Sequence, residues 1–280
     1  MKLNKENYYT PANNFLTSSK TRDYLKSPEY FFQKHVLNSI EQKKSDALLE
    51  GRMLDTLLTE GEDVFEYNFR PVERRSLKNP PTGYTEVTQT MYDACLQRAE
   101  KVKKTQAYKD LSLYKKQVIL EKEFQNFGKR FAGIAGMLDF LHVDEQKKYA
   151  VIIDLKTSTT VDPMKYYWHA IGYGYELQMA WYGWLVHEVY GIDYNAIEYG
   201  HLVIEKDTDG INRVGTFFFD KDLIMAKRNM LEDLAYEIAH QENFKDKDVT
   251  WEGAAYLGSF SKPGAVMMNP TDEDLESLPS

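Results

Sequence analysis

The stretch Gly133-Ile-Ala-Gly-Met-Leu-Asp-Phe-Leu-His-Val143, followed by Tyr149-Ala-Val-Ile-Ile-Asp-Leu-Lys156, decides the fold of this 280-residue chain. Both segments are short apolar runs, and the polar residues 144–148 between them are typical of a turn. So short a connection joins antiparallel neighbours, because parallel strands need a long crossover. The pattern therefore predicts a β-hairpin.

Charged side chains interrupt both predicted strands. Alternate side chains of a strand point to opposite faces, so Asp154 and Lys156 share one face while Leu155 points to the other. Asp139 lies on the paired strand, where a charged group needs an ionic partner or a metal. We expect the two carboxylates and the lysine to converge.

The predicted strand before the hairpin offers a third acid. It begins at Gln117 and ends near residue 126, and period-2 alternation places Glu121 and Glu123 on one face. Either glutamate could join the cluster. The residues alone do not choose between them, and we slightly prefer Glu121.

Helices and further strands surround the hairpin in the sequence. Periodicity predicts short helices up to about residue 60, a loop at 61–85, a helix at 88–107, a helical region at 164–190, strands at 197–205 and 213–219, and a helix at 221–240. This order predicts an α/β fold with a mixed β-sheet flanked by helices and with N-terminal helical additions. We expect one domain over 1–280, with a mainly helical region at 1–110, a catalytic core at 111–245 and a C-terminal extension at 246–280 whose tail is mobile.

Composition excludes several classes of protein. With 42% apolar and 28% charged residues, the chain is globular rather than collagen-like, coiled-coil or disordered. A net charge of −8 argues against a DNA coat held by bulk basicity, but leaves room for a local basic channel. No apolar run approaches a membrane span, and the first residues lack an apolar signal core. Cys95 is the only cysteine, so we expect a cytoplasmic protein with no membrane contact.

The predicted acidic cluster suits a hard divalent cation. Mg²⁺ prefers oxygen ligands and usually takes one or two protein carboxylates together with waters and phosphate oxygens. The matching reaction is phosphodiester hydrolysis, in which a neighbouring lysine can orient or help deprotonate the attacking water. The six histidines show no ligand spacing, and we interpret them as structural.

The spacing of an acid, any residue and a lysine is by itself a weak signal. It also occurs at Glu41-Gln-Lys43 and Glu145-Gln-Lys147, where a surface ion pair is the simpler interpretation. Only the copy at 154–156 ends an apolar strand that follows Gly136-x-x-Asp139 by one hairpin. This context favours a site.

A helix predicted after the hairpin adds a stripe of polar and aromatic side chains. Tyr175, Gln178 and Tyr182 have the spacing of one helix face, a pattern that also occurs in buried cores. In combination, Gly136-x-x-Asp139, Asp154-Leu-Lys156 and Gln178-x-x-x-Tyr182 resemble the PD-(D/E)XK nucleases, in the branch that contains the RecB nuclease domain and the phage exonuclease RecE. The resemblance spans about residues 15–205.

The N-terminal residues resemble the RecE side of this branch, the exodeoxyribonuclease VIII type. The segment from Ser18 to Phe32 is similar to the helical opening of those enzymes, and Ala47-Leu-Leu-Glu-Gly51 to the segment before their first motif. That motif usually ends in histidine, whereas this chain has Asp55, whose oxygens can replace imidazole at Mg²⁺ or Mn²⁺. Relatives with an iron–sulfur cluster use four cysteines, so no such cluster is expected here.

The resemblance implies a role for each motif residue. The implied catalytic residues are Asp139, Asp154, Lys156 and Gln178, with Lys156 positioning the water. The implied metal ligands are Asp139, Asp154, the Leu155 carbonyl, Asp55 and Glu121, the last matching an acid that these exonucleases often carry on the preceding strand. The side chains implied to orient the site or contact DNA are Gln178, Tyr182 and Tyr175.

The resemblance also implies a function. It is a restriction-endonuclease-like, Mg²⁺- or Mn²⁺-dependent deoxyribonuclease that digests linear double-stranded DNA from its ends, 5′ to 3′, in phage-type single-strand annealing recombination. A ring-shaped homo-oligomer and a single-strand annealing protein as partner are expected with it. Two alternatives stay open: a DNA-binding protein on the same fold with impaired catalysis, for which Asp55 in place of histidine is the motivation, and a structure-specific endonuclease.

Overall fold

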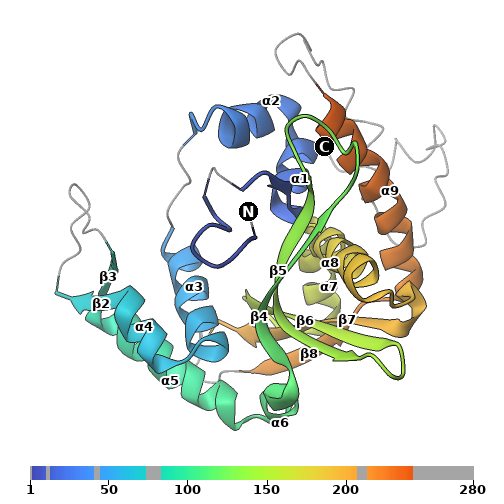
Figure 1. The fold of residues 1–280 in the computed structure, drawn as a ribbon. Coiled ribbons are helices and arrows are strands. Elements are labelled where there is room, and N and C mark those ends of the chain that lie inside the picture. Colours follow the sequence, from blue (N-terminus) through green and yellow to red (C-terminus); the bar gives the residue numbers. More distant parts are fainter. Residues whose placement is uncertain (1, 11–12, 41–44, 74–82, 207–212, 242–280) are drawn as a thin grey trace, which may run out of the picture.

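The predicted hairpin is the centre of a mixed sheet in the computed structural model, which describes residues 2–10, 13–40, 45–73, 83–206 and 213–241 (Figure 1). Strands β5 (Gly133–Asp144) and β6 (Tyr149–Ser158) pair in antiparallel register, with Phe140 opposite Ile153. The hairpin prediction is therefore confirmed.

Four further strands complete the six-stranded sheet. On one side, β6 runs parallel to β7, which pairs antiparallel with β8. On the other side, β5 pairs antiparallel with β4 and, over two residues, parallel with β1. These strands are β1 (Phe15–Leu16), β4 (Lys115–Glu123), β7 (Ile197–Glu205) and β8 (Val214–Phe218). The predicted mixed sheet is confirmed, whereas β1 is too short for a periodic signal.

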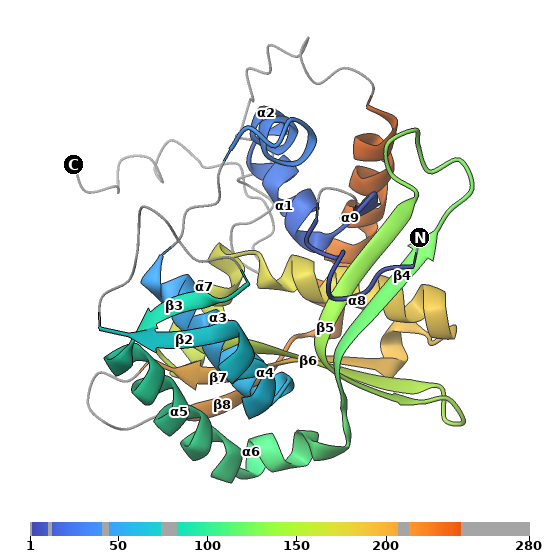
Figure 2. The same cartoon turned by 60° about the vertical axis from the view of Figure 1, so that its left-hand side comes forward.

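Helices pack against the sheet in two groups (Figures 1 and 2). The larger apolar cluster joins β4, β5 and β6 to α1 (Ser18–Lys26), α8 (Tyr175–Tyr190) and α9 (Lys221–His240). The second cluster joins α3 (Asp46–Thr59) and α5 (Gln89–Lys104) to Leu155 and Ile204 of the sheet. Leu155 thus faces α3 while its neighbours Asp154 and Lys156 face the other way, as the alternation predicts.

The loop predicted at 61–85 is a wrong prediction. The structure has helix α4 (Glu62–Asn68) and two parallel strands, β2 (Phe69–Val72) and β3 (Thr85–Thr88), in this stretch. Phe65, Phe69 and Val87 are buried in the second cluster, so tertiary packing orders residues whose local composition favours a loop. Residues 74–82 lie outside the described part of the chain.

The helical region predicted at 164–190 consists of two helices. Helix α7 (Pro163–Gly172) begins after the capping side chain of Asp162, and α8 begins after Gly174. Gly174 has a φ of +66°, a conformation that glycine adopts without steric cost, and this residue turns the chain between the helices. The described residues also form the short α-helices α2 (Pro28–Phe31) and α6 (Gln106–Lys109), a π-helical turn at Phe32–Val36 and 3-10 turns at Asp110–Leu113 and Tyr194–Ala196.

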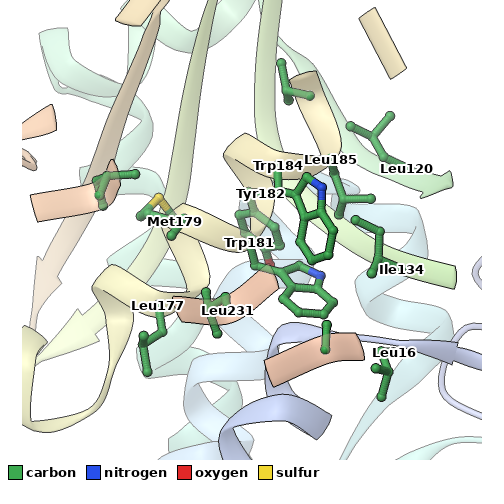
Figure 3. Packing of buried hydrophobic residues seen from close by; sticks show 14 of the residues in the cluster. Leu16, Leu120, Ile134, Leu177, Met179, Trp181, Tyr182, Trp184, Leu185 and Leu231 are labelled. Atoms are coloured by element: carbon green, nitrogen blue, oxygen red, sulfur yellow. The ribbon is translucent and has the colours of Figure 1, made fainter. Parts of the chain in front are cut away.

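Helix α8 is the centre of the larger core (Figure 3). Trp181, Trp184 and Leu185 on this helix are at most 1% exposed, and Leu120 and Ile134 of the sheet lie beside them. A helix that is apolar on all sides is one that the fold encloses. This enclosure fixes α8 against the part of β5 that does not pair with β6.

Two predictions concern the ends and the surroundings of the chain. Helix α9 ends at His240, and the extension predicted at 246–280, with its tail, lies outside the described residues. Among the helices that the structure describes, none has the length and apolar character required to cross a membrane.

Candidate active site

Strands β5 and β6 stop pairing at the position of their acidic side chains. Their ladder ends one residue short of Asp139 on β5 and Asp154 on β6. Beyond that point the backbone N–H of Leu155 donates to Asp139 Oδ2 at 2.8 Å. The sequence prediction that the two carboxylates lie on adjacent strands agrees with this geometry.

Helix α8 satisfies the backbone groups that the opening leaves on β5. The hydroxyl of Tyr182 donates to the carbonyl of Met137 at 2.9 Å, and the indole N–H of Trp181 donates to the carbonyl of Ala135 at 2.9 Å. An unpaired buried carbonyl would cost about 1–3 kcal/mol, so these two bonds stabilise the opening. Gly136 lies between the two carbonyls, where a Cβ atom would approach Leu185 to 2.7 Å.

Gln178 links the lysine to the buried aspartate. Its side-chain oxygen accepts a hydrogen bond from Lys156 Nζ at 3.0 Å, and its nitrogen donates to Asp154 Oδ1 at 3.0 Å and to the Tyr182 hydroxyl at 2.8 Å. Lys156 also forms an ion pair with Asp154 Oδ2. The structure thus brings together four residues that the sequence singles out.

Helix α3 brings a third carboxylate, Asp55, to the same place. The side-chain nitrogen of Gln117 on β4 lies 3.3 Å from Asp55 Oδ1 and 3.4 Å from Asp139 Oδ1, and it donates to Thr59 Oγ1 at 3.0 Å. Gln117 therefore bridges two acids from different elements. Its φ of +50° is unusual for a residue other than glycine and is the kind of local strain that occurs at functional sites.

Gln117, and not Glu121, is the β4 side chain that reaches the acids. Glu121 pairs with Ala135, four positions from Asp139 or roughly 13 Å along a strand, and its carboxylate accepts from the backbone N–H of Leu3 at 2.8 Å. Glu123 is exposed and lies further along the strand. The sequence alternation places Gln117 on the same face as both glutamates, but the register that aligns it with Asp139 requires the structure.

Burial and mutual repulsion raise the pKa values of the carboxyl groups in this cluster. The pKa of Asp55 rises to about 7, first because of burial and then because of the charge on Asp154. The pKa of Asp139 rises well above its usual range for the same reasons. Lys156 and the N–H of Leu155 oppose this rise at Asp139 without cancelling it. Both shifts favour the protonated form of these carboxyl groups.

Lys156 remains a cation in this setting. Burial lowers its pKa, but the charges of Asp154 and Asp139 outweigh burial, so the net shift of the pKa is upward. Its ammonium also lies 4.6 Å from the centre of the Tyr175 ring, a cation–π contact. Tyr175, predicted to orient the site or to contact DNA, therefore packs directly against the lysine.

His201 is a neighbour of the site that no pattern in the sequence singles out. It pairs with Asp154 in the parallel register of β6 and β7 and is fully buried. Its Nδ1 lies 2.6 Å from the Tyr166 hydroxyl, and its ring packs edge-on against Tyr175 at 5.4 Å. Burial, and then the charge of Lys156, lower the pKa of His201. The imidazole is therefore neutral and adds no charge beside the lysine.

The donor set fits a hard divalent cation. Asp139 and Asp154 offer carboxylate oxygens side by side, with Asp55 nearby, and such a cation usually takes only one or two protein carboxylates. Among the described residues, no three acidic, histidine or cysteine side chains already have the spacing of a metal cage. These oxygens now contact nitrogen atoms of Lys156, Gln117 and Gln178 and the backbone N–H of Leu155. A bound cation would lower the pKa values of Asp55 and Asp139 and so favour their ionised, metal-binding form.

A mixed sheet flanked by helices, with two acids and a lysine at an opening between its central strands, is consistent with a PDDEXK-type, restriction-endonuclease-like fold. The family model of the PDDEXK-like domain of unknown function (DUF3799) matches residues 17–257. The chain belongs to this family. No curated protein matches the chain.

One solved structure shows the same fold. A protein from Eubacterium rectale described as a "putative exonuclease" superposes with a TM-score of 0.61 at 20% identity, over 85% of this chain and 85% of that chain. A second structure, described as SSO0001, has 13% identity over 88% of this chain and 97% of that chain, with a TM-score of 0.28. The first likeness shows the fold, and together with the family it suggests a nuclease.

Proposed function

We propose that this protein is a metal-dependent deoxyribonuclease whose active site is the cluster at the opening between β5 and β6. The observation that carries the proposal is the convergence of Asp139, Asp154 and Lys156, with Gln178 bonded to the last two. Hydrolysis of a phosphodiester needs compensation of the phosphate charge and a positioned water. These residues supply the groups for both.

Each side chain has a task in this proposal. Asp139 and Asp154 would hold the cation, with Asp55 and the Leu155 carbonyl as further ligands. A divalent cation there would polarise a phosphoryl oxygen and lower the pKa of the attacking water. Lys156 would orient that water, and Gln178 would fix the ammonium and the Asp154 carboxylate in one arrangement, since its amide bonds to both.

The finer proposal is a RecE-like exonuclease of the exodeoxyribonuclease VIII type. It would digest linear double-stranded DNA from 5′ to 3′ with Mg²⁺ or Mn²⁺ in phage-type single-strand annealing recombination, as a homo-oligomeric ring in the cytoplasm beside an annealing protein. The order and spacing of the motifs at 136–139, 154–156 and 178–182 support it. A ring would let an acidic chain hold DNA through a local basic surface.

The experiment compares end-labelled linear duplex with closed circular DNA in Mg²⁺, Mn²⁺ or EDTA. We expect the wild-type protein to degrade the linear duplex alone, and EDTA and Lys156→Ala to abolish the reaction. Lys147→Ala is the matched control, because Lys147 ends a tripeptide of the same pattern but is 81% exposed in its side chain. The label that is lost first gives the polarity.

Two other outcomes would replace the proposal. Cleavage of the circle as well would indicate an endonuclease with the same catalytic residues. DNA binding without cleavage in any metal would indicate a DNA-binding protein with impaired catalysis. Two residues favour this second candidate. Asp55 stands where the RecE-like enzymes have histidine, and Gln117 places a neutral amide between Asp55 and Asp139.

A further inference from the structure

A series of aromatic rings leads from Lys156 to the surface. The Tyr175 ring contacts the ammonium at 4.6 Å, and the Tyr173 ring stacks on Tyr175 with a centroid distance of 5.7 Å and an interplanar angle of 22°. His169 packs against Tyr173 at 4.6 Å. Tyr173 is 59% exposed, whereas Tyr175 is partly buried. The outermost ring is thus open to solvent one stacked ring away from the proposed catalytic lysine.

The backbone holds the outer ring in place. Tyr173 is the C-cap of α7, and Gly174 in the left-handed conformation turns the chain so that Tyr173 and Tyr175 stack although they are two residues apart. Arg22 of α1 donates to the carbonyl of Tyr173 at 3.2 Å and fixes this turn from outside. Ser158 Oγ lies 3.2 Å from His169 Nδ1 and supports the inner side of the stack.

The guanidinium of Arg22 adds a positive charge beside the stacked rings. The guanidinium of Arg22 lies beside the turn and lowers the pKa of Tyr175 together with Lys156, although burial raises that pKa overall. Lys206 is near enough to His169 to lower its pKa, after burial as the larger cause. An exposed planar ring whose own carbonyl binds the guanidinium of Arg22 is complementary to a nucleotide, which presents a flat base and a negative phosphate.

We propose that Tyr173, stacked on Tyr175, is a platform for one unpaired nucleotide of a DNA strand beside the bond that is cut. This inference rests on the proposed nuclease function and adds to it the form of DNA that the site accepts: a single-stranded or frayed end, not an intact duplex. In a duplex both faces of every internal base are stacked on neighbours, so the bases along a strand have free faces for Tyr173 only where the strand is unpaired or its end has frayed.

The test measures binding in EDTA, where no cleavage occurs, by the fluorescence anisotropy of labelled oligothymidylate. Stacking of one base on an aromatic ring is typically strong enough that Tyr173→Ala should weaken binding by on the order of tenfold. Tyr173→Phe keeps the ring and should bind like the wild type. Tyr67→Ala, which removes a 70% exposed tyrosine on α4, is the matched control and should also bind like the wild type.

A second arm tests whether the base itself is the ligand. An oligonucleotide with abasic residues should bind the wild type about tenfold more weakly than oligothymidylate, and Tyr173→Ala should show no further loss, because both changes remove the same contact. The proposal is overturned if wild-type protein does not bind oligothymidylate, if Tyr173→Ala binds it normally, or if blunt duplex binding falls as much as single-strand binding. Equal melting temperatures of the variants exclude a folding defect.

The platform and the nuclease can fail separately. If the abasic oligonucleotide and Tyr173→Ala weaken binding without adding to one another, but no metal supports cleavage, the nuclease function is overturned and the platform stands. Cleavage that requires metal and Lys156, without that coupling, would overturn the platform and leave the nuclease.

Discussion

Two tripeptides of the same hairpin have the same pattern and opposite environments. Asp154-Leu-Lys156 lies where β5 and β6 open, and the side chains of its acid and lysine are 3% and 16% exposed. Glu145-Gln-Lys147 lies in the turn of the same hairpin, where Lys147 is 81% exposed and forms a 3.4 Å ion pair with Asp144. The same residue types thus form an enclosed cluster in one place and a hydrated surface pair in the other.

The difference shows that enclosure, not the tripeptide, makes the candidate site. In the turn, water screens the charges, and such pairs contribute little. At the opening, α8 and α3 enclose the charges, so the pKa values of Asp55 and Asp139 rise and Lys156 is held by two partners. A metal and a phosphate would meet fixed charges there, and each electrostatic contact would be stronger than in water.

The largest expected contrast is in catalysis. Asp154→Asn keeps the shape of the side chain and removes its charge, so we expect nuclease activity on linear duplex to fall by about 10²–10³-fold, the size of effect that one preorganised electrostatic group has at an active site. Glu145→Gln makes the same chemical change in the turn and should leave activity unchanged. Initial rates under identical metal conditions measure both. Full activity of Asp154→Asn would show that the enclosed tripeptide is no more important for catalysis than the one in the turn, and would contradict the site assignment.

The second contrast is in metal binding. A cation that binds only the folded state at 100 times its dissociation constant stabilises that state by about 2.7 kcal/mol. We therefore expect Mn²⁺ or Mg²⁺ to raise the melting temperature of the wild type, and to raise it much less in Asp139→Asn. Asp144→Asn removes an acid of the turn and should keep the full shift. A metal-induced shift that survives in Asp139→Asn would place the metal elsewhere.

The third contrast is the sign of the pH dependence. The pKa of Asp55 is raised to about 7, first by burial and next by Asp154. Its folded pKa lies above its unfolded value near 3.9, so the stability linked to its proton is complete below that value and is lost as the pH rises through 7. The variant Asp55→Asn removes this loss of stability. In EDTA above pH 7 we expect its free energy of unfolding to exceed that of the wild type by about 1–3 kcal/mol, a range reduced for the partial solvent exposure of Asp55.

Asp144, the last residue of β5 before the turn, should behave in the opposite way. Its pKa is lowered, first by the backbone N–H of Lys147, so its contribution is present above its unfolded pKa and is lost as the pH falls. Asp144→Asn should therefore destabilise at neutral pH rather than stabilise. Denaturant midpoints at pH 4, 7 and 9 measure both variants, and the same sign for both would contradict the electrostatic account.

The sequence predicted the hairpin and the sharing of a face by Asp154 and Lys156, because both follow from local alternation. It also predicted that Gln178 and Tyr182 follow on one helix stripe, and the structure brings them to Asp154 and to Met137. The match to the PDDEXK-like family confirms the fold class that these motifs predict.

The rest depends on contacts that local patterns do not contain. The register of β4 against β5 decides that Gln117 reaches the acids and that Glu121 binds the N–H of Leu3 instead. Helix α4 and strands β2 and β3 form because Phe65, Phe69 and Val87 join a shared core. No periodic signal covers such short segments, so sequence alone predicted a loop.

The smallest expected effect comes from copying the active tripeptide into the turn. Glu145→Asp with Gln146→Leu makes residues 145–147 identical to 154–156, yet these positions are exposed, so stability should change by no more than about 0.5 kcal/mol. Activity should stay at the wild-type level, and the copy should not restore activity to Lys156→Ala, because nothing in the turn encloses its charges or supplies a second acid and a glutamine. Melting curves and initial rates measure both effects. Any rescue of Lys156→Ala would mean that the tripeptide itself, rather than the opening between β5 and β6, carries the chemistry.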